Sequence, residues 1–193
     1  MRLFVAVQPP PAAVAELELA VAPLRTTWPG LRWTGAERWH VTLAFLGDVP
    51  EERLGELMRR LERAAARHPG TQVRVGRGGA FPSARKARVL CALIEGSPEA
   101  MSGLTRLAAS VAAASRRAGA PPPDEGRRLR PHITLARSRE PADLTAPVGT
   151  LGGFAGQQWS AGEIRLVRSY TGPLPRYETL GSWPLRSPRS ARG

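Results

Sequence analysis

The chain has 193 residues, of which 42% are hydrophobic and 23% are charged. This length suits one domain or two small lobes that share a core, and the apolar fraction excludes a disordered chain. No apolar run approaches the roughly 20 residues that span a membrane, and the short apolar start, followed by prolines at 9–11, is not typical of a signal peptide. We therefore expect a cytoplasmic protein, with a monomer as the default.

Composition excludes several kinds of site. Cys91 is the single cysteine, so no internal disulfide forms, and zinc sites built from Cys and His clusters are excluded by count. There is no GxGxxG or GxxxxGK[ST] signature, which removes the usual support for a dinucleotide or P-loop site. We predict no metal and no cofactor. Cys91 lies in an apolar segment and is interpreted as a small buried hydrophobe.

The formal net charge is +12, from 28 basic and 16 acidic residues, and only Lys86 of the basic residues is a lysine. One interpretation is a source genome that favours Arg, Ala, Gly and Pro together. The other is a polyanionic partner, because Arg forms bidentate contacts to phosphate and stacks on bases. Charge alone does not separate the two.

The apolar periodicity predicts an alternation of strands and helices along the chain. Helices are expected at residues 12–24, from about 51 to 68, and at 99–118. Strands are expected at residues 3–7, 31–33, 40–46, 71–75, 89–94, 133–136, 163–169 and 177–183. Loops are expected at the Gly- and Arg-rich segment 76–88 and the Pro-rich segment 120–130, and residues 187–193 are expected to form a disordered basic tail. Because several strands follow each other directly, the pattern favours an α+β or mixed-sheet fold over a doubly wound one.

A short internal repeat is the most informative feature. Residues 39–46 read Trp-His-Val-Thr-Leu-Ala-Phe-Leu, and residues 131–138 read Pro-His-Ile-Thr-Leu-Ala-Arg-Ser. Because side chains alternate along a strand, His40 shares a face with Thr42, and His132 shares a face with Thr134. If the repeat reflects a sheet with a pseudo-two-fold axis, these two pairs meet across a central groove.

Two imidazoles and two hydroxyls, without a carboxylate, suit chemistry at a phosphodiester. One neutral imidazole can take a proton from water while one imidazolium protonates the leaving oxygen, and the hydroxyls can donate to non-bridging oxygens. Arg137 would point away from His132 in an ideal strand, although a bulge or a strand end could turn it toward the phosphate. His68 has no partner in the repeat and is interpreted as structural.

The two motifs and their flanks resemble the 2H phosphoesterase superfamily. Within it, the chain resembles the bacterial and archaeal RNA 2′,3′-cyclic phosphodiesterases, also called the LigT or 2′-5′ RNA ligase family. The resemblance covers about residues 1–185 and extends to the segments 1–7, 79–90 and 172–185. One His-x-Thr motif is a worthless signal, whereas two with these flanks are highly specific.

The resemblance implies an α+β fold of two pseudo-symmetric lobes, with antiparallel or mixed sheets and outer helices, around a cationic cleft in a single domain at residues 1–186. It implies hydrolysis of RNA or nucleoside 2′,3′-cyclic phosphates to 2′-phosphates without a metal. His40 is then the proton donor and His132 the proton acceptor. The residues that hold the phosphate are Thr42, Thr134 and Arg137. The aromatic residue that the family often has before the second histidine is absent at 129–131.

Several alternatives stay open at this stage. Phe4, Phe81 and Tyr177 are candidates for contacts to a base or to RNA, but core packing is the stronger interpretation for Phe4 and an equal one for Phe81. The segment 120–130 is either a lid over the cleft or a linker. Two other functions compete with hydrolysis, namely RNA end-joining through a 2′–5′ linkage and binding of a nucleotide or RNA end without turnover.

Overall fold

The computed structural model describes residues 1–123, 126, 128–172 and 175–187 of the chain. Its α+β architecture confirms the expected fold class, with one nine-stranded sheet whose strand pairings are antiparallel. The prediction of a disordered tail falls almost entirely on residues 188–193, which lie outside the described residues. No helix in the described part of the chain combines the length and the apolar character that crossing a membrane requires.

Most of the strands lie where the sequence predicts them, and several of them extend further than predicted. They are β1 Arg2–Val7, β2 Arg32–Trp33, β3 Val41–Asp48, β4 Thr71–Phe81, β5 Ala87–Glu95, β6 His132–Ala142, β7 Trp159–Ala161, β8 Glu163–Tyr170 and β9 Arg176–Pro184. The helices are α1 Pro11–Thr27, α2 Leu54–Ala65, α3 Pro98–Arg117 and α4 Thr145–Thr150, with a 3₁₀ turn η1 at Ala36–Arg38.

The sheet has the order β7-β4-β5-β6-β3-β1-β8-β9, with β2 added on β6. The two strands that carry the repeat, β3 and β6, are therefore neighbours at its centre. Along this order each is flanked by three further strands, β5, β4 and β7 on the side of β6 and β1, β8 and β9 on the side of β3. This arrangement makes two similar halves around a central seam.

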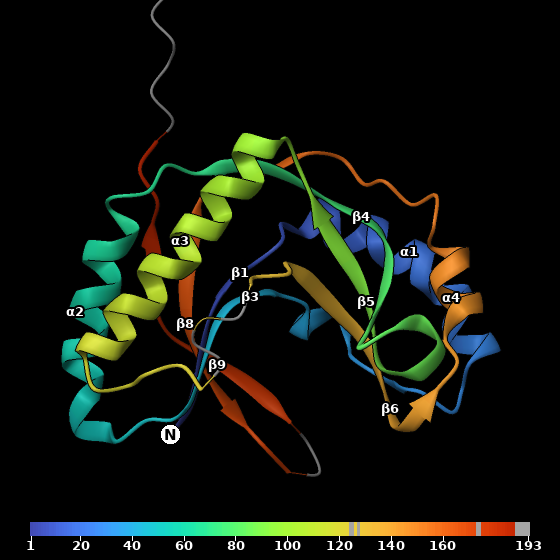
Figure 1. Cartoon of the computed structure of the whole chain (residues 1–193), viewed down its shortest axis with the longest axis horizontal. Helices are drawn as coiled ribbons and strands as arrows, with labels where there is room; N and C mark the ends of the chain where they lie inside the picture. Colours follow the sequence, from blue (N-terminus) through green and yellow to red (C-terminus); the bar gives the residue numbers. More distant parts are fainter. Residues whose placement is uncertain (124–125, 127, 173–174, 188–193) are drawn as a thin grey trace, which may run out of the picture.

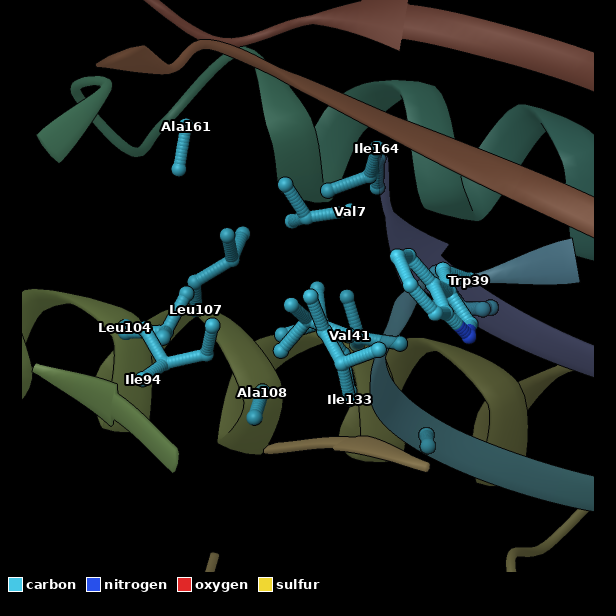
Figure 2. Packing of buried hydrophobic residues seen from close by; sticks show 14 of the residues in the cluster. Val7, Trp39, Val41, Ile94, Leu104, Leu107, Ala108, Ile133, Ala161 and Ile164 are labelled. Atoms are coloured by element: carbon cyan, nitrogen blue, oxygen red, sulfur yellow. The ribbon is translucent and has the colours of Figure 1, made fainter. Parts of the chain in front are cut away.

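Helices cover the sheet in two groups. Figure 1 shows α2 and α3 side by side at one end of the molecule, and α1 and α4 at the other. The core lies between the helices and one face of the sheet. At the seam, Val41 and Ile133 are 1% and 0% exposed, and Figure 2 shows them in one cluster with Leu107 and Ala108 of α3.

The helix ends follow local sequence signals. Helix α1 begins directly after two prolines with Pro11 at its first position, where the missing N–H costs nothing. The Ser97 hydroxyl accepts a hydrogen bond from the Ala100 amide at 3.2 Å and caps α3. Gly119, with φ of +78°, follows the end of the same helix.

One loop prediction was wrong. The first part of the Gly- and Arg-rich segment continues strand β4 as far as Phe81. Glycine is needed there for close packing, because a Cβ at Gly78 would lie 2.8 Å from the Cβ of Leu151. The short helix α4, which precedes Leu151 and packs on β4, was not predicted either.

Candidate active site

The seam of the sheet places the two repeats face to face. Strands β3 and β6 pair through one antiparallel bridge, between Val41 and Ile133, which are the residues that follow each histidine. Equivalent positions of the two repeats are thus opposite each other, and an approximate two-fold axis passes between them. Both bridge residues are buried in the core, so the alternating His and Thr side chains face the other side.

Continuing this register sets the neighbours across the seam. His40 comes opposite Thr134, and His132 comes opposite Thr42, so each imidazole has the hydroxyl of the other repeat beside it. Both threonine side chains are half-buried, and no described group forms a hydrogen bond with either hydroxyl. The predicted quartet of two imidazoles and two hydroxyls therefore lies on one face, with both hydroxyls available to a ligand.

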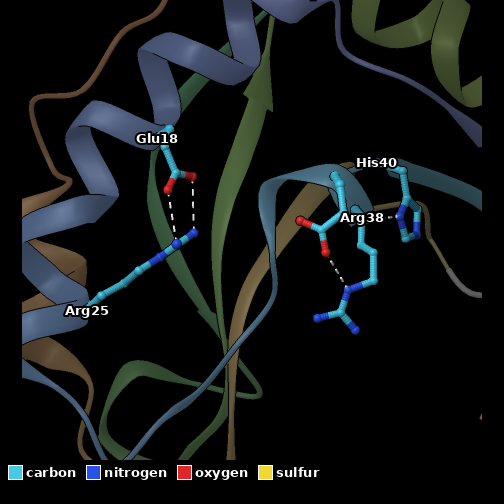
Figure 3. A network of polar contacts seen from close by, with 5 residues as sticks. Glu18, Arg25, Arg38 and His40 are labelled. Atoms are coloured by element: carbon cyan, nitrogen blue, oxygen red, sulfur yellow. Dashed lines mark hydrogen bonds and ion pairs between the residues drawn. The ribbon is translucent and has the colours of Figure 1, made fainter. Parts of the chain in front are cut away.

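The two imidazoles are anchored in the same way. The Nδ1–H of His40 donates to the carbonyl oxygen of Arg38 at 2.7 Å (Figure 3), and the Nδ1–H of His132 donates to that of Arg130 at 2.7 Å. Since a carbonyl oxygen only accepts, Nδ1 carries the proton and Nε2 is the nitrogen available for proton transfer. Each imidazole can then accept a proton at Nε2 when neutral, or donate one from Nε2 when charged.

A bulge in each motif strand decides where the following residue points. In the pairing of β6 with β5, Thr134 faces Cys91 and Ala136 faces Leu90, so Leu135 is an extra residue. Leu135 and Ala136 are both buried in consequence, and Arg137 turns back to the face of His132. The ideal-strand expectation for Arg137 was therefore wrong, and the bulge that was considered as an exception is present. Strand β3 has the same shift at its own motif leucine, Leu43.

Different aromatic rings support the two imidazoles. The ring of Phe4 stacks on His40 with 4.6 Å between centroids, and Tyr177 meets the His40 ring edge-on at 5.4 Å. Phe4 is only 2% exposed and leaves little surface for a base, whereas Tyr177 is 39% exposed. On the other side, the ring of Phe81 lies 4.8 Å from that of His132. Phe81 thus stands next to the second histidine, where the preceding segment lacks an aromatic residue.

The pKa values of both histidines are lowered from the ordinary value of 6.5. Burial is the largest cause for each, and the hydrogen bond to the backbone carbonyl raises the pKa in partial compensation. The charge of Arg137 lowers both pKa values further, and the charge of His132 lowers that of His40. The second imidazole and Arg137 are therefore close enough to His40 for their charges to act on it.

Two cavities open beside the quartet. One of about 230 Å³ borders His40, Phe4 and Tyr177 and also contacts the polar side chains of Gln8 and Arg165. The other, of about 600 Å³, borders His132, Phe81 and one face of α3, and residues of the segment 120–130 form part of its wall. A substrate held between the imidazoles therefore has a chamber on either side.

Other groups contribute less to this site. His68 donates or accepts at Nε2 with the Ser110 hydroxyl at 2.7 Å, in agreement with a structural role. Burial raises the pKa of the Cys91 thiol to about 12, which makes it a poor nucleophile. Over the described ranges of the chain, no three His, Cys, Asp or Glu side chains gather into a set that could hold a metal ion.

Comparison with known families supports the duplicated arrangement. The sequence profile of the LigT-like phosphoesterases matches residues 7–91 and 94–177, and each of these segments contains one of the two His-x-Thr motifs. The chain belongs to the LigT-like phosphoesterase family. The match covers most of the chain and confirms the family resemblance found in the sequence.

Relatives of known name agree with this assignment. The LigT-like phosphoesterase is 33% identical over 199 residues to an RNA 2′,3′-cyclic phosphodiesterase of Thermus thermophilus, covering 96% of this chain and 91% of the relative. A protein of the same name from Aquifex aeolicus is 29% identical over 55% of this chain and 54% of its own length.

Solved structures give the same result for the fold. A crystal structure from Thermus thermophilus superimposes with a TM-score of 0.76 at 31% identity, over 97% of this chain and 99% of the other. The E. coli LigT in complex with 3′-AMP superimposes with a TM-score of 0.69 at 25% identity, over 95% and 96% of the two chains.

The sequence interpretation of this LigT-like phosphoesterase missed one element of the site. Arg38 and Arg130, whose carbonyl oxygens anchor the imidazoles, each stand two residues before a histidine. The repeat is thus two residues longer than the His-x-Thr pattern, since it begins Arg-x-His in both copies. This extension was visible in the sequence, but its purpose lies in the backbone carbonyl rather than in the side chain.

Proposed function

We propose that this LigT-like phosphoesterase hydrolyses 2′,3′-cyclic phosphates, at RNA ends or on nucleosides, to 2′-phosphates without a metal ion. The observation that carries the proposal is the pair of imidazoles, His40 and His132, each anchored at Nδ1 by a backbone carbonyl and each facing a free threonine hydroxyl. The names of the Thermus and Aquifex relatives agree with it. We further propose that residues 1–186 act as one domain and that the protein works as a monomer.

The reaction needs one proton removed and one supplied. Nε2 of a neutral His132 accepts a proton from water, whose oxygen attacks phosphorus from the side opposite the 3′ oxygen. The bond from phosphorus to the 3′ oxygen breaks, and Nε2–H of a protonated His40 gives its proton to that oxygen. The 2′ oxygen keeps the phosphate, so the product is a nucleoside 2′-phosphate.

The phosphate itself is held by groups whose own charge does not change during the reaction. The hydroxyls of Thr42 and Thr134 donate to the non-bridging oxygens, where negative charge concentrates in the transition state. Arg137 lies on the same face and supplies a positive charge near both imidazoles. These three residues position the phosphorus between the two histidines.

The assignment of His40 as the acid follows the family, and the cavities agree with it. In-line attack puts the leaving oxygen, and hence the ribose that carries it, on the side of the acid. The cavity beside His40 offers the half-exposed ring of Tyr177 for stacking on the base. The nucleoside is then held beside His40, and water enters beside His132.

The charge state that this mechanism needs is one proton on the pair of imidazoles. Because a charge on His132 lowers the pKa of His40, the pair resists taking up two protons together. The singly protonated pair is therefore the active form, and it exists over a limited pH range.

Incubation of the purified protein with 2′,3′-cyclic AMP in excess EDTA tests the proposal. We expect turnover to 2′-AMP at an undiminished rate in the chelator. Formation of 3′-AMP would mean that the other ester bond breaks, and loss of turnover in EDTA that returns with added metal would contradict a metal-independent reaction.

End-joining of RNA is a second candidate, favoured by the size of the cavity beside His132. A 5′-hydroxyl RNA end in that cavity could replace water as the nucleophile and form a 2′–5′ linkage. Mixing an RNA with a cyclic phosphate end and an RNA with a 5′-hydroxyl end separates the two reactions, because only joining yields a longer strand. A binding module without turnover predicts that neither product forms.

A further inference from the structure

Two arginines face each other directly next to the quartet. In the pairing of β2 with β6, Arg32 is opposite Arg137, and directly opposed residues of an antiparallel pair project from the same face. Trp33, the next residue of β2, is opposite the buried Ala136 and packs on the core, so Arg32 points to the face of the quartet. Both arginines are exposed.

This pair lacks the partner that other arginines have. Arg25, Arg74 and Arg165 each lie within 3.2 Å of a glutamate oxygen. No described carboxylate lies within ion-pair distance of Arg32 or Arg137. Like charges placed directly opposite each other destabilise a sheet. A phosphate between the two guanidinium groups would remove this repulsion, because each group offers a planar pair of donors to phosphate oxygens.

The position of the pair relative to the quartet indicates which phosphate it fits. The charge of Arg137 lowers the pKa of both imidazoles, whereas the charge of Arg32 shifts the pKa of neither imidazole. Arg32 therefore lies further out from the scissile phosphate than Arg137 does. From the seam, β6 runs past Thr134, the residue opposite His40, to reach Arg137, so the pair lies on the flank of His40.

The opposite flank differs at the equivalent position. Phe45 is the fifth residue after His40, as Arg137 is the fifth after His132, and its ring stacks with Phe4 at 6.3 Å. Phe45 borders the cavity next to His132, together with the apolar face of α3. The cavity next to His132 is also lined by Arg128 and Arg130, but these come from the segment 120–130 and not from the motif strand. Of the two residues at this motif position, Arg137 alone can bind a second phosphate, and it lies on the flank of His40, where the proposed function places the ribose of the cyclic end.

We propose that Arg32 binds the phosphodiester that precedes the cyclic nucleotide in an RNA chain, and that Arg137, which lies between Arg32 and the quartet, is shared between this phosphate and the scissile one. The inference rests on the proposed function, and it makes RNA ends, rather than free cyclic mononucleotides, the preferred substrates. The ribose beside His40 continues through its 5′ oxygen to this upstream phosphate. Arg32 has no other part in the reaction, so its contribution appears only when the substrate has an upstream phosphate.

The test compares 2′,3′-cyclic AMP with the dinucleotide ApA that ends in a 2′,3′-cyclic phosphate. For the parent protein we expect a higher kcat/KM with the dinucleotide. The Arg32→Gln variant should reduce this preference about tenfold, and the slope of log kcat/KM against log salt concentration for the dinucleotide should fall by about 1. Removal of Arg32 also relieves repulsion, so the Tm of the variant should equal or exceed that of the parent.

Arg63→Gln, an exposed position on α2, is the matched control, because it makes the same change in net charge away from the site. An equal loss of preference in this control would show a general charge effect and overturn the inference. So would a parent protein without preference for the dinucleotide, or an Arg32→Gln variant that keeps it. If Arg32→Gln lowers the Tm, Arg32→Lys keeps the charge and should retain part of the preference. Absence of turnover with both substrates in the parent protein would instead contradict the proposed function.

Discussion

The two halves of the sheet share a backbone plan and differ in the side chains placed on it. Each half supplies a strand with Arg-x-His-x-Thr, an imidazole held by the carbonyl two residues earlier, and a bulge at the motif leucine. Five residues after the histidine, however, one half has Phe45 and the other has Arg137. The shared backbone places two similar proton-transfer groups around one point. At this position the two halves differ, because one flank has a charged side chain and the other an aromatic ring.

The largest effect is expected from removing either histidine. His40→Ala and His132→Ala should each reduce kcat by about 10²–10⁴-fold, because one loses the acid and the other the base. Assays with 2′,3′-cyclic AMP at saturation measure this loss. Near-normal turnover in either variant would break the idea that both halves contribute to one reaction.

The control for these variants is His68→Ala. This imidazole binds the Ser110 hydroxyl away from the quartet, so its removal should leave kcat unchanged. Circular dichroism should show that all three variants fold, since all three histidine side chains are only half-buried.

The next effect concerns the seam that joins the halves. Ile133→Ala should lower the free energy of unfolding by about 2–5 kcal/mol, because a fully buried side chain at the centre leaves a cavity. Val41→Ala, the equivalent change in the other half, should cost less, since fewer carbon atoms are removed. Urea denaturation measures both values. A loss below about 1 kcal/mol for Ile133→Ala would mean that the seam is not a tightly packed part of the core.

A smaller and symmetric effect is expected from the two threonines. Thr42→Val and Thr134→Val should each reduce kcat roughly 10- to 100-fold, since each removes one hydrogen bond to a charged oxygen without changing side-chain volume. Thr27→Val on α1 is the control, because that hydroxyl binds the backbone of its own helix. Unequal losses would show that one of the two hydroxyls stabilises more of the negative charge on the phosphate.

The smallest effect is a shift in pH dependence. Because both histidines have pKa values below 6.5, the bell-shaped profile of kcat/KM should have its maximum on the acid side of pH 6.5. Arg137 lowers both pKa values, so Arg137→Gln should move both limbs toward higher pH in addition to weakening phosphate binding. A shift toward lower pH, or no shift, would contradict the placement of Arg137 near both imidazoles.

The sequence predicted the repeat, the strands that carry it and the four residues of the quartet, because alternation along a strand and the burial of Val41 and Ile133 are local consequences of composition. It could not place Arg137, since a single extra residue at Leu135 reverses the face of every residue that follows. It also missed the second half of β4. Glycines such as Gly78 are typical of loops, but here the glycine allows the strand to pack closely against Leu151. Both errors depend on neighbours that are distant in the chain.

Arg32 illustrates a further limit. Nothing in the local sequence distinguishes it from the other arginines. Its role is inferred only from its position opposite Arg137, in a two-residue strand. In the same way, the ring beside His132 comes from Phe81, about fifty residues earlier, and not from the segment that precedes the histidine. Contacts of this kind depend on how the strands are ordered in the sheet, which cannot be read from the local sequence pattern.

The central claim is that His40 and His132 act on one phosphate group. A titration of the protein with 2′-AMP, followed through the NMR signals of the three histidine rings, tests it most directly. The signals of His40 and His132 should move together and follow one single-site binding curve with a common Kd, while those of His68 stay in place. Movement of only one of the two rings, or saturation of the two at different concentrations, would contradict it.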